Sequence, residues 1–206
     1  MTRFAAVFAL LLALAGCASG PPAAPQPRPD AYPGDLIDSR ELPDGLFLRQ
    51  RIGATFDKHE LSFQAVLQTD QGVLSLLALT PYGTRAFLIE QRGVEVKLTQ
   101  FVDRELPFPP RFILLDVHRT LFHRLSPAAL PDGLHEASRF DERVVERWHG
   151  GRLLERTFVR LDEKPPGTIR IVYHGGMPAG FAPPTRIELD NGWFGYRLWI
   201  ETLQTQ

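Results

Sequence analysis

The feature of this sequence that most limits its fold is a series of short segments in which apolar and polar residues alternate. Clear examples lie at 61–68, 94–99 and 169–173. Successive side chains of a β-strand point to opposite faces, so each segment has the pattern of a strand with one buried face. Turn sequences separate the segments, among them Gly-Gly at 150–151 and Asn-Gly at 191–192, and they favour hairpins. The sequence therefore predicts a long antiparallel meander.

Ten strands are expected from this pattern. They span 46–55, 61–69, 73–80, 84–91, 94–102, 142–149, 152–161, 168–174, 185–190 and 193–202. Two runs, 73–79 and 193–200, are apolar on both faces and are expected to be covered on both sides. They are either central strands of a packed core or the lining of an apolar cavity, and Leu77 and Leu79 are the candidate lining residues.

One segment has helical rather than strand periodicity. Within 111–125, apolar side chains project over one broad arc and polar side chains over the other. The polar arc consists of Asp116, Arg119, Thr120 and His123. This predicts an amphipathic helix of about four turns, which Pro127 and Pro131 would end. The fold class is thus mainly β, a curved antiparallel sheet or incomplete β-barrel with the helix over one face or mouth. The candidate lid residues are Leu114, Val117, Leu121 and Leu125.

Acidic and basic residues alternate over 141–147, and we interpret them as the solvated face of a strand. They are Asp141, Glu142, Arg143, Glu146 and Arg147. The glycine-rich stretch 175–180 lacks the lysine and the following helix of a phosphate loop, so it is expected to be a flexible loop. Residues 128–138 are expected to form a loop or a short, broken helix.

The search for catalytic or metal-binding motifs identifies no candidate. The sequence has no Gly-x-Ser-x-Gly elbow and no His-Glu-x-x-His. Two of the six histidines, His118 and His123, lie five apart on the expected helix, which places them on different faces rather than on one metal-binding face. No catalytic residue, metal or cofactor is therefore predicted.

The N-terminus has the pattern of an export signal: a charge at Arg3, an apolar run, and small residues before Cys17. The run is too short for a membrane-spanning helix, which needs about 20 apolar residues. The sequence Leu-Ala-Gly-Cys at 14–17 resembles the bacterial lipobox, which implies cleavage before Cys17 and a lipid on its sulfur. An ordinary secretory peptide with a chance cysteine is the alternative. Ala18 and Ser19 resemble the sequence of lipoproteins sorted to the outer membrane.

The chain is expected to have three parts. Residues 1–16 form the signal peptide, 17–34 a lipidated cysteine with a proline-rich tether, and 35–206 a single domain. The formal net charge is −1, and loss of Arg3 with the signal would make it −2. A nucleic-acid partner, which would favour a basic face, is not expected.

Residues 61–98, especially 76–84, and the end of the chain from 184–189 onward resemble the LolA/LolB-type lipoprotein carriers and receptors. The resemblance implies an incomplete antiparallel barrel, an apolar cavity and helices as a lid. A closer resemblance is to an uncharacterised lipoprotein family of Gram-negative bacteria, often encoded beside aryl-polyene pigment genes. In the LolB-type receptors a tight turn presents a leucine to the membrane. Here Thr80-Pro81-Tyr82-Gly83 places a tyrosine there, so Pro81, Tyr82 and Gly83 are the candidate membrane-contact loop.

Together these features predict a non-enzymatic lipoprotein, anchored by lipid to the periplasmic face of the outer membrane. It would bind an acylated or aryl-polyene lipid, or a lipoprotein, in an apolar cavity for transfer to the outer membrane. A periplasmic carrier or an envelope assembly would be its partner. The main alternative is a structural accessory subunit that docks on a membrane assembly. An enzyme acting on lipid or thioester intermediates comes third, because no nucleophile and base can be named.

Overall fold

The computed structural model describes residues 32–205, except 57, 104, 105, 107 and 181. The strands are β1 (Phe47–Phe56), β2 (His59–Asp70), β3 (Val73–Leu79), β4 (Arg85–Arg92), β5 (Glu95–Gln100), β6 (Gly133–Arg139), β7 (Glu142–His149), β8 (Arg152–Arg160), β9 (Thr168–Pro178), β10 (Arg186–Asn191) and β11 (Tyr196–Thr205). The helical elements are the 3-10 turn η1 (Ser39–Glu41), the α-helix α1 (Pro110–Val117) and the π-helical turn η2 (His118–Phe122). No helix of this described part is long and apolar enough to cross a membrane.

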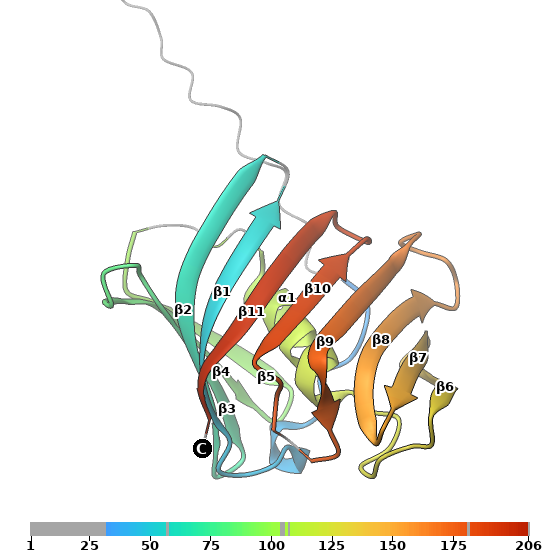
Figure 1. Ribbon diagram of the computed structural model, residues 1–206. Coiled ribbons are helices and arrows are strands. Elements are labelled where there is room, and N and C mark those ends of the chain that lie inside the picture. The colour runs from blue at the N-terminus through green and yellow to red at the C-terminus, as the bar shows by residue number, and fades with distance from the viewer. Residues whose placement is uncertain (1–31, 57, 104–105, 107, 181, 206) are drawn as a thin grey trace, which may run out of the picture.

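The eleven strands form one antiparallel sheet, in the order β5-β4-β3-β2-β1-β11-β10-β9-β8-β7-β6 (Figure 1). Two meanders, β1–β5 and β6–β11, meet where β1 pairs with β11. Register shifts, such as those between Arg49 and Gln50 and between Ala78 and Leu79, bend the strands as bulges do. The sheet is therefore open and curved, with β5 and β6 at its edges, which confirms the predicted fold class.

Three stretches differ from the expected elements. Residues 193–195, which were expected to begin the last strand, lie in the turn before β11, and Trp199 is 37% exposed, so the run 193–200 is not covered on both sides. Residues 133–139 form the strand β6, and β9 continues to Pro178 through the stretch that was expected to be a loop. β6 pairs only with β7 and is exposed along almost its whole length, so it has no apolar face to produce an alternating pattern. In β9, Met177 is buried and lies opposite Leu153 of β8, and this pairing continues the strand past the two glycines.

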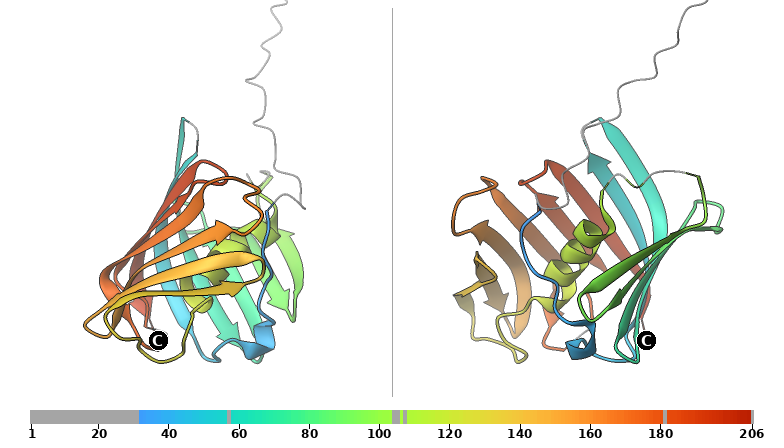
Figure 2. Two further views of the ribbon diagram at one scale, coloured as in Figure 1. Left: turned by 90° about the vertical axis from the view of Figure 1, so that its right-hand side faces the viewer. Right: turned by 180° about the vertical axis from the view of Figure 1, so that it is seen from behind.

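The core lies between the concave face of the sheet and the helix (Figure 2). Its side chains come from both meanders and from α1, for example Leu48 of β1, Ile89 of β4, Ile171 of β9 and Leu114 of α1, and all four are fully buried. The helix was expected as one element over 111–125. Instead α1 continues into η2, and the helical residues end at Phe122.

Candidate functional site

The candidate site is the helix that lies in the concave face of the sheet (Figure 2). Pro110 occupies the first turn of α1, where its missing N–H leaves no hydrogen bond unmade. Phe112, Leu114 and Leu115 are at most 2% exposed and pack in one cluster with the apolar side chains of the sheet. The helix then widens into the π-helical turn η2, a form of backbone that is often found at functional positions.

The polar side of the helix is buried too, whereas the polar side of an amphipathic surface helix usually faces solvent. Asp116, Arg119, Thr120 and His123 are at most 7% exposed. Residues 32–42 cover these polar side chains, because they run alongside the helix on the open side of the concave face (Figure 2). We call residues 32–42 the strap. With the sheet on one side and the strap on another, these polar groups must find partners inside the protein.

Three helix side chains contact the strap backbone. Arg111 Nη2 donates to Gly34 O over 2.9 Å, Arg119 Nη2 donates to Pro33 O over 2.6 Å, and His118 Nδ1 accepts from Ile37 N over 3.1 Å. Gly34 has a φ of +108°, and a Cβ there would overlap the Arg119 guanidinium, so only glycine fits this crossing. Tyr32 is buried, so the packed part of the protein already includes this residue of the stretch 17–34, which was predicted to be the tether.

A hydrogen-bonded group joins the strap, the helix and the last two strands. The hydroxyls of Tyr32 and Tyr196 each donate to one oxygen of the buried Asp116 carboxyl. Asn191 Nδ2 donates to both hydroxyls, over 2.8 Å each. Burial raises the pKa of Asp116 to about 6, although the two tyrosine hydroxyls act in the opposite direction. This carboxyl is therefore expected to change its charge in mildly acidic solution.

The guanidinium of Arg119 is enclosed by residues that do not belong to the helix. Its Nη2 donates to Glu142 Oε1 over 2.5 Å, and both side chains are 1% exposed. Its carbon lies 4.7 Å from the ring centre of Tyr32, 5.0 Å from that of Trp193 and 5.6 Å from that of Phe158. We call Tyr32, Glu142, Phe158 and Trp193 the Arg119 cage. It combines a carboxylate with aromatic faces, both of which attract a cation.

Next to the cage lies a second buried ion pair, between Arg156 of β8 and Glu146 of β7. Arg156 Nε donates to Glu146 Oε1 over 2.8 Å, and Arg156 Nη1 donates to the carbonyl oxygen of Arg119 over 2.7 Å. Glu142 and Glu146 are therefore buried, which corrects their assignment to a solvated strand face. They alternate along β7 with Arg143 and Arg147, which are exposed, so the acidic side of this strand faces inward.

Both histidines of the helical segment lie inside the protein. His118 Nε2 and Gln91 Oε1 are 2.8 Å apart, whereas neither ring nitrogen of His123 has a hydrogen-bond partner. Burial lowers the pKa of His118 to about 3 and that of His123 to about 2, so both rings are neutral near pH 7. Among residues 32–205, apart from the five undescribed positions, no group of three or more His, Cys, Asp or Glu could hold a metal ion.

The predicted lid and lining residues have different positions. Leu114 and Leu121 are buried at 0% and 6% exposure, and Val117 and Leu125 are half-buried against the same core. In β3 the buried side chains are instead Leu74, Leu76 and Ala78, whereas Leu77 and Leu79 are half-buried. Because side chains alternate along a strand, Leu77 and Leu79 point to the outer face and do not contact the helix side of the sheet.

The predicted membrane-contact loop is a tight turn between β3 and β4. Gly83 N donates to Thr80 O over 2.9 Å, and Gly83 has a φ of +80°. Tyr82 is 93% exposed at this turn. The structure therefore presents Tyr82 to solvent. Cys17, the predicted lipidation site, lies outside the described residues.

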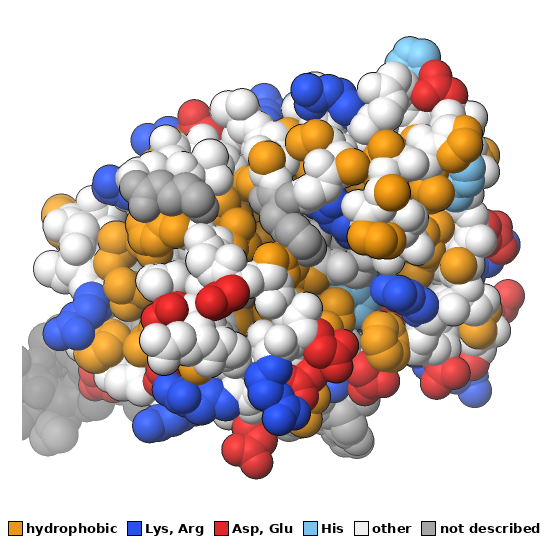
Figure 3. All heavy atoms as spheres, turned by 90° about the horizontal axis from the view of Figure 1, so that it is seen from below, with side chains coloured by type: hydrophobic (Ala, Val, Ile, Leu, Met, Phe, Trp, Pro, Cys, Tyr) orange, Lys and Arg blue, Asp and Glu red, His pale blue; other side chains and the backbone are white. Residues whose placement is uncertain are grey.

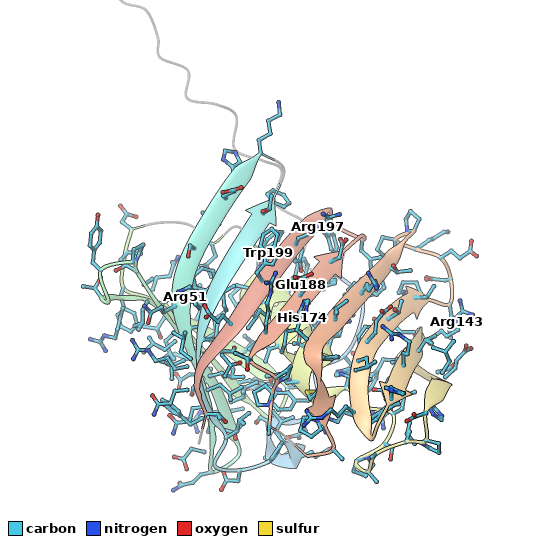
Figure 4. All side chains as sticks on the ribbon, in the orientation of Figure 1. Arg51, Arg143, His174, Glu188, Arg197 and Trp199 are labelled. Carbon is cyan, nitrogen blue, oxygen red and sulfur yellow. The ribbon has the colours of Figure 1, made fainter. Side chains whose placement is uncertain are left out.

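A shallow groove of about 290 Å³ lies on the outer face of β9–β11 (Figure 4). It is lined by Arg170, Val172, Glu188, Leu189, Asp190, Arg197, Leu198 and Trp199. Trp199 is 37% exposed. Glu188 Oε1 is 3.1 Å from His174 Nε2, and Asp190 Oδ2 is 3.2 Å from Arg197 Nε. Charges of both signs are also mixed on the face seen from below in Figure 3, so neither surface has a single sign.

The sequence from 48 to 204 matches the family described as "Protein of unknown function (DUF3261)". The chain belongs to this family. No curated protein matches it.

Two solved structures are similar to this DUF3261 chain. One is a LolA superfamily protein from Nitrosomonas europaea, with 13% identity and a TM-score of 0.40, over 82% of this chain and 89% of that one. The other is a domain classed as an outer membrane lipoprotein-sorting protein from Vibrio parahaemolyticus, with 7% identity and a TM-score of 0.42, over 82% and 87%. The function proposed below rests on the geometry of the DUF3261 chain itself.

Sequence reasoning did not identify Tyr32, Asp116 or Arg119 as residues of the site. One signal was available for Tyr32, since it is the one large aromatic residue in the proline-rich stretch 17–34. No comparable signal exists for Arg119 and Asp116, because charged residues on a helix are usually solvated.

Proposed function

We propose that this protein is a non-catalytic lipoprotein of the outer membrane, facing the periplasm, that takes up an acylated or aryl-polyene lipid, or the acyl groups of a lipoprotein. The ligand would bind in the concave face of the sheet, in the place that the helix occupies here. The aryl-polyene alternative comes from the sequence resemblance. The acyl alternative is supported by the geometry described above.

The observation that carries the proposal is the way in which the helix is held. Its apolar side, including Phe112, Leu114 and Leu115, covers an apolar sheet lining of the kind that an acyl chain would contact equally well. Its polar side is held by the strap and by single side chains of the sheet. The sheet is open at β5 and β6, so no closed barrel wall surrounds the helix. The helix can therefore leave the concave face without any strand pair breaking.

The strap determines how readily the helix leaves. Removal of the Tyr32 hydroxyl breaks its hydrogen bond to Asp116 but keeps the ring, which packs on Phe112 and Phe194 with centroid distances of 4.9 Å each. A buried hydrogen bond to a charged group contributes about 1.5–3 kcal/mol. Tyr32→Phe should therefore loosen the helix, whereas the hydrogen bonds of Arg111, His118 and Arg119 to the strap remain.

The experiment measures uptake of a fluorescent sixteen-carbon acyl probe by the full-length protein in lipid nanodiscs, with hydrogen exchange of residues 110–125 as the second readout. Probe binding should speed exchange in this segment, and Tyr32→Phe should increase both uptake and exchange. Ser138→Ala is the control, because it removes a hydroxyl from an exposed side chain of β6. Probe binding with unchanged exchange of 110–125 would exclude the displacement mechanism. If neither the wild type nor Tyr32→Phe takes up the probe, the result would favour the alternative function, an accessory subunit that docks on a membrane assembly. The groove beside Trp199 is the candidate surface for such docking.

A further inference from the structure

The Arg119 cage has the composition of a cation receptor. Its carboxylate comes from β7, one ring from β8, one from the turn between β10 and β11, and one from the strap. Trp193 and Tyr32 are 8% and 2% exposed, so the cage is almost completely desolvated. Aromatic faces around a cation, away from water, are the arrangement with which proteins bind ammonium groups. The helix contributes only the cation.

A guanidinium is an imperfect occupant of this cage. Arg119 Nη2 has two acceptors, Pro33 O and Glu142 Oε1, but Nε and Nη1 are buried and have no hydrogen-bond partner. A buried donor without an acceptor is destabilising. A quaternary ammonium has no N–H group and would meet the same carboxylate and the same rings without this cost. The cage thus suits a cation that has fewer N–H donors than the guanidinium of Arg119.

We propose that the Arg119 cage is the headgroup site of the ligand, and that the ligand is a lipid whose headgroup carries a quaternary or substituted ammonium. This inference rests on the proposed function, in which the helix leaves the concave face. Arg119 then leaves with η2, and the buried carboxylate of Glu142 needs another cation, because an uncompensated buried charge is strongly destabilising.

When the helix leaves, Tyr32 loses its hydrogen bond to Asp116 and its contact with Phe112, but other contacts hold it in the cage. Tyr32 keeps the hydrogen bond from Asn191 Nδ2 and its edge contact with Trp193, at a centroid distance of 6.1 Å. Phe158 lies opposite the fully buried Ile169 of β9, which leads from the cage into the apolar part of the concave face. An ammonium in the cage would therefore place its hydrocarbon chain along the surface that the helix now covers.

The test uses three photoreactive alkyl probes that share one chain and one diazirine and differ only in headgroup: trimethylammonium, sulfate or uncharged glucoside. Each is added to the full-length protein in lipid nanodiscs, and labelled peptides are quantified by mass spectrometry. The trimethylammonium probe should label β8–β10 roughly 30-fold more than the glucoside probe, the ratio that corresponds to one desolvated cation–π contact. The sulfate probe should label these strands least.

Two variants separate the cage from the rest of the concave face. Glu142→Gln should lower trimethylammonium labelling and leave glucoside labelling unchanged, whereas Glu136→Gln, at an exposed carboxylate on β6, should change neither. Arg119→Met removes the internal cation, so trimethylammonium labelling should rise. An increase in labelling cannot result from loss of folding. Arg119→Met therefore still tests the site if Glu142→Gln destabilises the fold.

The outcomes distinguish the inference from the proposed function. Equal labelling of β8–β10 by all three probes, or an unchanged headgroup preference in Arg119→Met, would overturn the ammonium site while the acyl-binding function stood. Absence of labelling in the concave face by any probe would overturn both.

Discussion

Substitution of Asp116 by asparagine tests the buried network directly. The ordinary pKa of this carboxyl is 3.8, and burial raises it to about 6 in the folded protein. The shift is a little over two units, and each unit corresponds to about 1.4 kcal/mol, so the folded state binds this proton more tightly by about 3 kcal/mol. This stability is fully present below about pH 4 and is lost as the pH rises through about 6. Asparagine is neutral throughout.

The measurement is the free energy of unfolding in urea for the wild type and Asp116→Asn, at several pH values from 4 to 7.5. The depressed pKa values of His118 and His123 should destabilise both proteins in acid, and this effect cancels in the difference between them. Relative to Asp116→Asn, the wild type should lose about 3 kcal/mol between pH 4 and 7.5. A difference that does not change with pH would show that burial does not raise the pKa of this carboxyl, and would refute the expected pH dependence.

Five further substitutions test the helix, the turn and the anchor. Leu121→Asp places a charge at a site that is 6% exposed, and should lower the Tm by roughly 10 °C, from a loss of about 2–5 kcal/mol. Leu121→Met should change stability by less than about 1.5 kcal/mol and retain acyl-probe uptake, and loss of uptake at unchanged Tm would contradict the packing described here. Tyr82→Glu should leave the Tm unchanged but weaken binding to anionic liposomes; retained binding with a large fall in Tm would refute the contact role. Cys17→Ser should abolish labelling by an alkyne fatty acid and block normal signal cleavage, and equal labelling of mutant and parent would refute lipidation. Ala18→Asp should shift the protein to inner-membrane fractions on a sucrose gradient.

Much of the sheet could be predicted because its signals are local. The run 94–99 alternates at period two and becomes β5, and the Gly-Gly pair at 150–151 becomes the β7–β8 turn. β6 could not be predicted in this way, since an edge strand that buries almost nothing has no apolar periodicity to detect. The position of the helix could also be predicted from a local signal, because the apolar arc that includes Leu114 and Leu121 is visible in the sequence.

The residues of the site depend on contacts between distant segments. Arg119 meets Glu142 across 23 positions, and Tyr32 meets Asp116 across 84. A pattern within one helix or strand assigns its polar residues to solvent, because that is where isolated charges are most stable. Such a pattern does not show whether a strand or strap from elsewhere will remove that solvent.

The sequence alone therefore determined where most strands and turns form, that one amphipathic segment interrupts them, and that the sheet is antiparallel, since each of these follows from backbone preference and side-chain period. Only the tertiary structure decided which side of the helix is covered, that β7 turns Glu142 and Glu146 inward, and that Tyr32 belongs to the packed protein. The physical reason is that burial belongs to the assembled surfaces. A charge becomes an interior group when two segments enclose it, and its partner is then the nearest opposite charge in space rather than in sequence.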